Sequence, residues 1–220
     1  WEAITDGEVA LAILPLFHSF GQSCVMNARL ARGSTITLLP AYDPVRVLEI
    51  IQRDKVTNFA GVPTMYLQLL NHPDLDKFDL GSLRECVSGG APIPIDTLER
   101  WKKKFNMDIQ EGYGLTETSP VLTINPPNRP KIGTVGKAIE NTELKIAEDG
   151  EILSRGPQIM RGYFNKAQAT VDSINPEGWF HTGDIGRIDE DGYLMITDRK
   201  KDLLVMSNGK NVAPQPIEQL

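Results

Sequence analysis

The sequence has few cysteines, a modest share of aromatic residues and no excess of positive charge. Its two cysteines, Cys24 and Cys86, lie far apart in apolar surroundings, which favours buried free thiols over a disulfide and indicates a reducing compartment. Lys and Arg number 23 against 29 Asp and Glu, so the net charge is -6 and no nucleic-acid partner is expected. No apolar run reaches membrane-spanning length and no signal peptide opens the chain. We therefore expect a cytoplasmic protein without a transmembrane segment, although peripheral contact with a membrane surface stays open.

The composition is that of an ordinary globular protein, with 40% hydrophobic and 24% charged residues, and 220 residues suffice for one or two domains. The first half alternates between strand and helix patterns. Strands are predicted over residues 9–14, 34–39, 56–60, 83–87 and 107–110, with helices starting near residues 44, 63 and 95. Asp43-Pro44 marks one of these helix starts, because Asp is a good N-cap and Pro suits the first helical turn. This alternation predicts an α/β fold with a mostly parallel sheet flanked by helices.

The pattern changes after about Pro120. Short apolar runs over residues 143–146 and 151–155 flank Asp149-Gly150, and runs over 185–188 and 193–197 flank a second turn that ends in Gly192. Asp-Gly between apolar runs is a strong hairpin signal, so a small antiparallel, β-barrel-like subdomain is predicted. We expect domain boundaries at residues 1–125, 126–197 and 198–220, the last being a hinge and the beginning of a truncated C-terminal domain. Within it, a strand over 203–206, a turn over 207–210 and a helix from 214 are predicted.

The segment from Gly112 to Glu117 carries the clearest chemical signal. Its two glycines let the chain bend sharply and lie close to a ligand, and Tyr113 between them offers a flat face to a base. Thr116 can donate a hydrogen bond to a phosphate oxygen, and Glu117 can hold a hard cation such as Mg²⁺. A second glycine turn, Gly89-Gly90, also follows a predicted strand. Parallel sheets bind ligands at the carboxyl ends of their strands, so both turns are placed for a nucleotide.

Five segments stand in a characteristic order, and together they resemble the adenylate-forming (AMP-binding) superfamily, most closely its fatty-acid–CoA ligases. The segments are Pro15 to Gly21, Ser88 to Pro92, Gly112 to Glu117, Gly178 to Asp184, and Asp198 to Asp202 with Ser207 to Asn211. The resemblance covers nearly the whole chain and implies a fragment of the N-terminal domain with the hinge. It implies that a carboxylic acid, of medium or long chain, reacts with ATP to give acyl-AMP and pyrophosphate, and that coenzyme A then displaces AMP. Mg²⁺ and hydrogen-bond donors would offset the charge that develops in this transfer.

The resemblance also implies roles for individual residues. The nucleotide-binding residues would be Gly89, Gly90, Ala91, Pro92, Glu111, Gly112, Tyr113, Gly114, Thr116, Asp184, Ile196 and Arg199. Within this set, Gly90 to Pro92 and Tyr113 would flank the adenine, while Asp184 and Arg199 would reach the ribose. Thr116 would contact the α-phosphate, Glu117 the metal, and His18 would stand beside the acyl carboxylate and the thiol path. Lys201 would be the hinge, and Gly209, Lys210 and Asn211 would line the coenzyme A channel.

Other interpretations of the same residues remain open at this stage. His18 alone would more often be a packed core histidine, Asp184 could cap a turn, and residues 199–202 could be a solvated charge run. The family's Ser/Thr/Gly-rich phosphate loop and its late catalytic lysine do not occur in the sequence, and Asn208 stands where close relatives often have Gly. We therefore expect the 220-residue chain alone to be nearly inactive in adenylate formation while still binding AMP or ATP. Alternatives are an acyl-AMP ligase that loads a carrier protein and a non-catalytic nucleotide-binding module. Because the chain opens on Trp1 and not on Met, it is expected to begin inside a larger protein.

Overall fold

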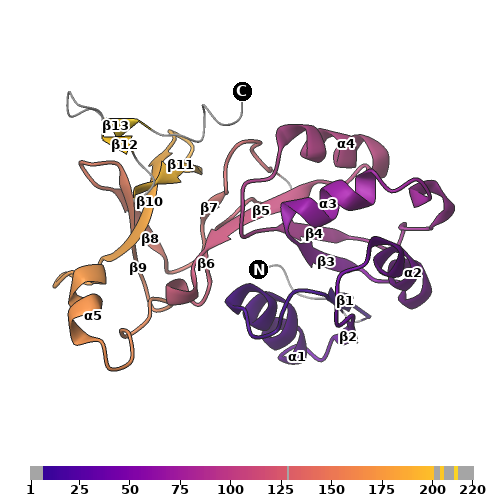
Figure 1. The fold of residues 1–220 in the computed structure, drawn as a ribbon, viewed down its shortest axis with the longest axis horizontal. Coiled ribbons are helices and arrows are strands. Elements are labelled where there is room, and N and C mark those ends of the chain that lie inside the picture. The colour runs from indigo at the N-terminus through magenta and orange to yellow at the C-terminus, as the bar shows by residue number, and fades with distance from the viewer. Residues whose placement is uncertain (1–6, 128, 201–203, 206–210, 213–220) are drawn as a thin grey trace.

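The computed structural model describes residues 7–127 and 129–200, together with the backbone of 204–205 and 211–212. Two β-sheets dominate it (Figure 1). The larger sheet has seven strands in the order β2-β1-β3-β4-β5-β6-β7, and the smaller has four in the order β11-β10-β9-β8. The predicted α/β class with an added antiparallel β unit is thereby confirmed.

The larger sheet is parallel over its first five strands and antiparallel beyond them. The strands are β1 (Val9–Ala12), β2 (Thr35–Leu38), β3 (Asn58–Gly61), β4 (Glu85–Ser88), β5 (Ile109–Gly114), β6 (Val121–Ile124) and β7 (Lys137–Ala138). β1, β2, β3, β4 and β5 pair in parallel, and β5 then pairs antiparallel with β6, with a register shift between Tyr113 and Gly114. The sheet thus reaches residue 138, while the boundaries proposed at residues 125 and 197 stay predictions.

Helices cover both faces of this sheet. On one face lie α2 (Pro44–Asp54), α3 (Pro63–Leu70) and α4 (Ile95–Phe105), which pack on the main core. There the buried Tyr66 hydroxyl donates to the carbonyl oxygens of Phe59 (2.9 Å) and Val87 (2.8 Å) and so ties α3 to two strands. The other face carries η1 (Gly21–Asn27), a π-helix, and α1 (Ala28–Leu30), which the sequence did not predict. Figure 1 shows these two groups on opposite sides of the strands.

The predicted helix start at Asp43 is confirmed. The Asp43 side chain accepts a hydrogen bond from the backbone N–H of Arg46 at 2.8 Å, with Pro44 in the first turn. This cap satisfies one of the donors that every helix start leaves unpaired. The helix ends at Lys55, which has φ 52 and therefore adopts the left-handed conformation that often stops a helix.

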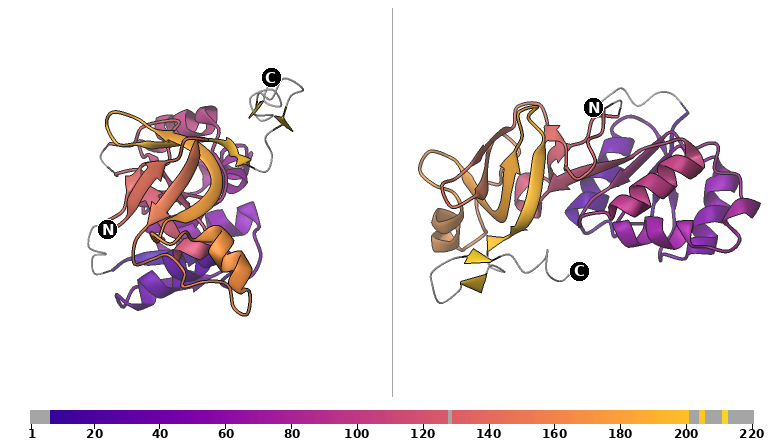
Figure 2. Two further views of the ribbon diagram at one scale, coloured as in Figure 1. Left: turned by 90° about the vertical axis from the view of Figure 1, so that its left-hand side faces the viewer. Right: turned by 90° about the horizontal axis from the view of Figure 1, so that it is seen from above.

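The smaller sheet is strongly curved and lies beside the β6–β7 end of the larger one (Figure 2). It consists of β8 (Glu143–Ile146), β9 (Glu151–Arg155), β10 (Phe180–Ile188) and β11 (Leu194–Arg199), all antiparallel. Both predicted hairpins form, and in the second the Asp189 side chain accepts from the backbone N–H of Tyr193 at 2.9 Å. β10 is longer than predicted because register shifts on both sides of Ile185 let the strand continue through Gly183.

Three short helices complete the described chain, namely η2 (Leu75–Lys77), η3 (Thr116–Thr118) and α5 (Ala167–Ser173). β12 (Leu204–Val205) and β13 (Asn211–Val212) form a small antiparallel pair within the predicted third piece. The turn predicted over 207–210 and the helix predicted from 214 lie outside the described residues. Across the part of the chain that the structure describes, every helix is too short or too polar to cross a bilayer.

Candidate active site

Two adjoining cavities lie at the carboxyl ends of β3, β4 and β5. The larger, of about 260 Å³, runs along the η1 face of the sheet, and the smaller, of about 200 Å³, lies toward the second sheet. Residues that line both are Gly90, Gly112, Tyr113, Gly114, Leu115 and Arg199. The predicted glycine turns therefore meet at one place, where the wall between the two cavities is formed.

The turn after β5 is held in a fixed shape by backbone contacts. The N–H of Leu115 donates to the carbonyl of Pro120 at 3.0 Å and lies 2.9 Å from the Thr118 hydroxyl, which is fully buried. Gly114 leaves no room for a side chain, since a Cβ there would lie 1.9 Å from the Pro120 carbonyl oxygen. With the turn pinned in this way, Thr116 and Glu117 line the mouth of the larger cavity.

Glu117 has a partner that the sequence did not indicate. The Tyr163 hydroxyl donates to Glu117 Oε1 at 2.9 Å, and the Glu117 carbonyl accepts from the N–H of Met160 at 2.8 Å. Partial burial, followed by the bond to Glu117, raises the Tyr163 pKa, so this hydroxyl stays a donor at neutral pH. Tyr163 lies on the loop between β9 and α5, where no periodicity or motif singles it out.

Glu117 also fits the one metal role that the sequence assigned. In the described part of the chain, no group of three or more His, Cys, Asp and Glu side chains could hold a metal ion. Mg²⁺ is commonly held by one or two carboxylates while phosphate oxygens and water fill its other positions. A single half-buried carboxylate at a cavity mouth matches that donor set, with Oε1 held by Tyr163.

Asp184 crosses from the second sheet to meet Tyr113. The Tyr113 hydroxyl donates to Asp184 Oδ2 at 2.6 Å, and Arg199 Nε lies 3.4 Å from the other carboxylate oxygen. Burial above all, and then the Asp184 charge, raise the pKa of Tyr113, so its proton stays on the phenol. Both residues line the smaller cavity with Ile196 and Arg199. Tyr113 and Asp184, which are 71 residues apart in the sequence, thus lie with Ile196 and Arg199 around one space that Gly112 and Gly114 also line.

The turn after β4 supplies the opposite wall. Gly90, Ala91 and Pro92 line the smaller cavity, and Gly90 has φ +83, a backbone conformation that side chains resist. Gly89 lines the larger cavity, and a Cβ there would lie 3.2 Å from the ring of Phe20, the residue directly before η1. Close packing of backbone on ring explains why glycine stands at this strand end.

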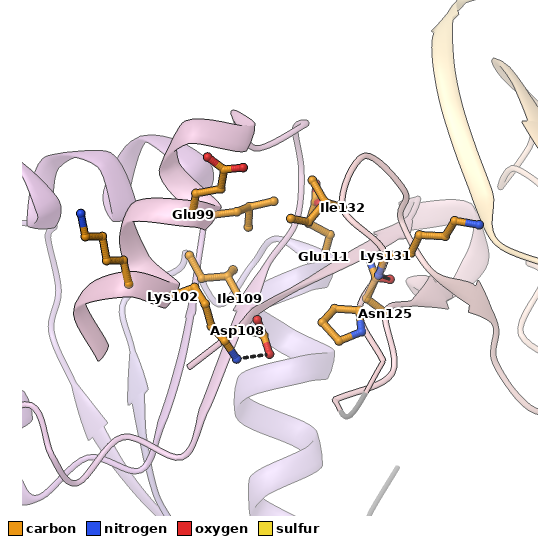
Figure 3. Close-up of a pocket in the computed structure, with 11 residues that line it drawn as sticks. Glu99, Lys102, Asp108, Ile109, Glu111, Asn125, Lys131 and Ile132 are labelled. Atoms are coloured by element: carbon orange, nitrogen blue, oxygen red, sulfur yellow. Dashed lines mark hydrogen bonds and ion pairs between the residues drawn. The ribbon is translucent and has the colours of Figure 1, made fainter. Parts of the chain in front are cut away.

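Glu111 is a buried carboxylate in the smaller cavity, 8% exposed, with the N–H of Ile93 3.4 Å from its Oε1. Burial raises its pKa to about 7. The same residue lines a further cavity of about 270 Å³ on the α4 side, shown in Figure 3. Lys102 of that cavity is paired with Asp108 at 2.8 Å, so this cation is already neutralised.

His18 is exposed and lines the larger cavity, so the structure does not support a core histidine. Its Nδ1 accepts from the N–H of Phe20 at 3.2 Å. The neighbouring Ser19 hydroxyl lies 3.3 Å from the Thr116 hydroxyl, which joins the loop after β1 to the turn after β5. Of the remaining predicted residues, Lys201, Gly209 and Lys210 lie outside the described residues, and of Asn211 only the backbone, in β13, is described.

The floor of the larger cavity is polar, and no sequence motif predicted this. It includes Cys24, Arg29, Asn58 and Glu85. Arg29 is 4% exposed and pairs with Glu8 at 2.7 Å and Glu85 at 3.2 Å. The expected free thiols are confirmed, with Cys86 fully buried and Cys24 half-buried. Burial raises the pKa of Cys24 to about 11 although Arg29 opposes the shift, so this thiol is a weak nucleophile.

Comparison with known proteins identifies the family to which this chain belongs. The family model described as AMP-binding enzyme matches residues 1–164. The chain belongs to the AMP-binding enzyme family. A long-chain-fatty-acid–CoA ligase of Bacillus subtilis (strain 168) is 39% identical over 226 residues, which cover 96% of this chain and 40% of that protein. A 4-coumarate–CoA ligase 2 of Oryza sativa subsp. japonica is 38% identical over 231 residues, 97% of this chain and 40% of the relative.

Solved structures of AMP-binding enzymes agree with the fold. O-succinylbenzoate coenzyme A synthetase from Bacillus subtilis, in complex with ATP and magnesium ion, superimposes with a TM-score of 0.88 at 33% identity. The match covers 99% of this chain and 47% of that one. The chain thus spans less than half the length of these AMP-binding relatives, all of them named as acid–CoA ligases or synthetases although their acids differ.

Proposed function

We propose that the protein containing this chain activates a carboxylic acid with ATP and transfers the acyl group to coenzyme A. The observation that carries the proposal is the convergence of the Thr116–Glu117 turn, the Gly89–Gly90 strand end and the Asp184–Arg199 pair around two joined cavities. Acid–CoA ligase names among its relatives support it. The finer proposal is that the acid is a medium- or long-chain fatty acid and that the protein is cytoplasmic, and the fatty-acid ligase among those relatives supports this choice of acid.

The smaller cavity would hold the nucleoside. Gly90, Ala91 and Pro92 would lie against the adenine, with Tyr113 opposite and Ile196 beside it. Asp184 would accept hydrogen bonds from the ribose hydroxyls, a role that suits a carboxylate already held by Tyr113 and Arg199. Glu111, with its backbone neighbours Gly112 and Gly114, would close the cavity toward β5.

The mouth of the larger cavity would hold the reacting groups. A carboxylate oxygen of the acid attacks the α-phosphorus, and the bond from that phosphorus to the bridging oxygen breaks to release pyrophosphate. Thr116 would donate to an α-phosphate oxygen, and Glu117 would hold Mg²⁺, which when bound offsets the charge that builds up in transfer. Ser19 would fix the Thr116 hydroxyl, 3.3 Å away, in the phosphate's direction.

In the second half-reaction the coenzyme A sulfur attacks the acyl carbon and the carbon–oxygen bond to AMP breaks. His18, exposed at the cavity mouth, would lie beside the carboxylate and the thiol path. The sequence resemblance assigns the hinge to Lys201 and the coenzyme A channel to Gly209, Lys210 and Asn211. These four assignments are part of the proposal and concern the end of the chain.

Exchange of radiolabelled pyrophosphate into ATP, measured on the full-length protein with a panel of acids, tests the proposal. Glu117→Gln should lower acid-dependent exchange by about a hundredfold or more, as removal of one transition-state contact does in other enzymes. Glu140→Gln, an exposed carboxylate away from both cavities, is the matched control and should leave exchange unchanged. Absence of exchange with every acid of the panel would favour a non-catalytic nucleotide-binding module. Exchange followed by transfer only to a phosphopantetheinyl carrier would favour the carrier-loading ligase.

A further inference from the structure

The larger cavity changes character from its mouth to its floor. Along the η1 face of the sheet, Ala60 and Val87 give it apolar walls, while Asn58 and Glu85 stand below them. The register pairs Asn58 with Glu85 and Ala60 with Val87, so each polar residue is two positions before an apolar one. Glu85 lies three positions before the strand end at Ser88, which corresponds to about 10 Å of extended backbone.

The floor is a charge cluster with unused hydrogen-bonding capacity. Arg29 Nη1 and Nη2 bind Glu8 and Glu85, whereas its buried Nε has no partner in the described parts of the chain. Glu85 Oε2 accepts from both Arg29 and the Asn58 amide. Its side chain is still 36% exposed, and the described residues donate no hydrogen bond to Oε1. One guanidinium thus faces two carboxylates, and one carboxylate oxygen is open to the cavity.

The charges and the open Glu85 oxygen at the floor determine which chemical group can end the acid that the cavity holds. An alkyl end pressed onto the floor would bury the open Glu85 oxygen without a partner, which costs free energy. A second carboxylate would add a third negative charge beside a single cation. An ammonium group would lose its hydration to reach a carboxylate that Arg29 already pairs. A hydroxyl can donate to Glu85 Oε1 and carries no charge to desolvate.

We propose that the cavity selects a carboxylic acid whose apolar stretch ends in a hydroxyl group about 10 Å from the reacting carboxylate, with Glu85 as the selecting residue and Arg29 positioning it. The inference rests on the proposed function, because the larger cavity must hold the acid. It narrows the substrate class to hydroxylated acids.

The test measures acid-dependent ATP–pyrophosphate exchange by the full-length protein. The panel contains straight-chain acids from butanoic to hexadecanoic, with the ω-hydroxy, ω-amino and dicarboxylic counterpart of each. The expected result is a value of kcat/KM at least about tenfold higher for an ω-hydroxy acid of matching length than for the plain acid. Equal or better use of the plain, amino or dicarboxylic acids overturns the inference and leaves the proposed function standing. No exchange with any acid refutes the proposed function itself.

Variants of Glu85 test whether the preference for the ω-hydroxy acid arises at the floor of the larger cavity. Glu85→Leu should remove the preference for the ω-hydroxy acid, mainly through a higher KM for that acid, and should improve use of the plain acid. Glu85→Gln keeps a hydrogen-bonding group and should retain part of the preference, so it serves if the leucine variant does not fold. The control Glu143→Leu removes an exposed ion pair with Arg155 outside both cavities and should leave selectivity unchanged. Unchanged selectivity in both Glu85 variants would overturn the assignment.

Discussion

Replacement of Gly114 by alanine should destroy the candidate site through backbone overlap alone. The new Cβ would lie 1.9 Å from the Pro120 carbonyl oxygen and 2.9 Å from the Cα of Val121, and neither atom belongs to a flexible side chain. The two strands must therefore separate by more than 1 Å, roughly the shortfall from ordinary van der Waals contact. This movement also breaks the hydrogen bond from Leu115 N–H to Pro120.

The expected cost combines overpacking with the lost hydrogen bond and amounts to about 2–4 kcal/mol of the free energy of unfolding. For a folded unit of about 220 residues such a loss lowers Tm by roughly 5–15 °C. Thermal unfolding followed by circular dichroism measures it. Because Thr116 and Glu117 follow directly, ATP binding in a calorimetric titration should be lost at a temperature where the variant is still folded.

Gly112→Ala is the matched control, two residues earlier on the same strand. There the nearest atom to a new Cβ is the Thr123 carbonyl oxygen at 3.4 Å, an ordinary contact, and φ is not in the left-handed region. Its Tm should stay within a few degrees of the wild type. If both variants unfold alike, or if Gly114→Ala keeps full ATP affinity, the reasoning from backbone overlap is refuted.

Three further changes probe individual contacts. Tyr113→Phe removes the 2.6 Å bond to Asp184 and should weaken AMP binding by about tenfold or more, measured by calorimetry, with unchanged affinity counting against a role for this pair. Glu111→Gln tests the buried carboxyl, whose folded pKa of about 7 exceeds its ordinary value of 4.5. The free energy of unfolding of the wild type should therefore fall as pH rises between these values, by roughly 3 kcal/mol. The variant should lack this decline in urea unfolding, and an equal decline would refute the assignment. Tyr163→Phe frees Glu117 Oε1 and should raise the dissociation constant of Mn²⁺ with ATP about three- to tenfold by electron paramagnetic resonance, whereas no change would exclude a positioning role.

Local sequence signals predicted much of the fold because the relevant physics is local. The Asp43 cap and the first-turn Pro44 fixed a helix start, and Asp-Gly turns fixed both hairpins. The π-helix Gly21–Asn27 gave no such signal, because its apolar residues follow neither a helical nor a strand period. The antiparallel extension by β6 and β7 was likewise not predicted.

The candidate site also contains residues that the sequence singled out and residues that it did not. Residues within motifs, such as Thr116 and Asp184, line the cavities, and the roles that the sequence assigned to them stay predictions. Tyr163 and Glu85 were not found, because their partners lie 46 and 56 residues away and nothing in the local sequence marks them. Side chains that hold a functional residue from another element depend on tertiary packing, which a single sequence does not show.

The contacts between the two sheets explain why the site lies where it does. Backbone hydrogen bonds join β11 to the two residues that precede β7, from the N–H of Val135 to Leu194 at 2.9 Å and from the N–H of Leu194 to Gly136 at 2.8 Å. Buried backbone bonds of this kind resist shear, since breaking them leaves unpaired groups. Tyr113 and Asp184 therefore meet across a fixed junction and need no ligand to bring them together. The smaller cavity is thus preorganised by the fold, while the floor of the larger cavity is assembled from side chains of η1, α1, β3 and β4.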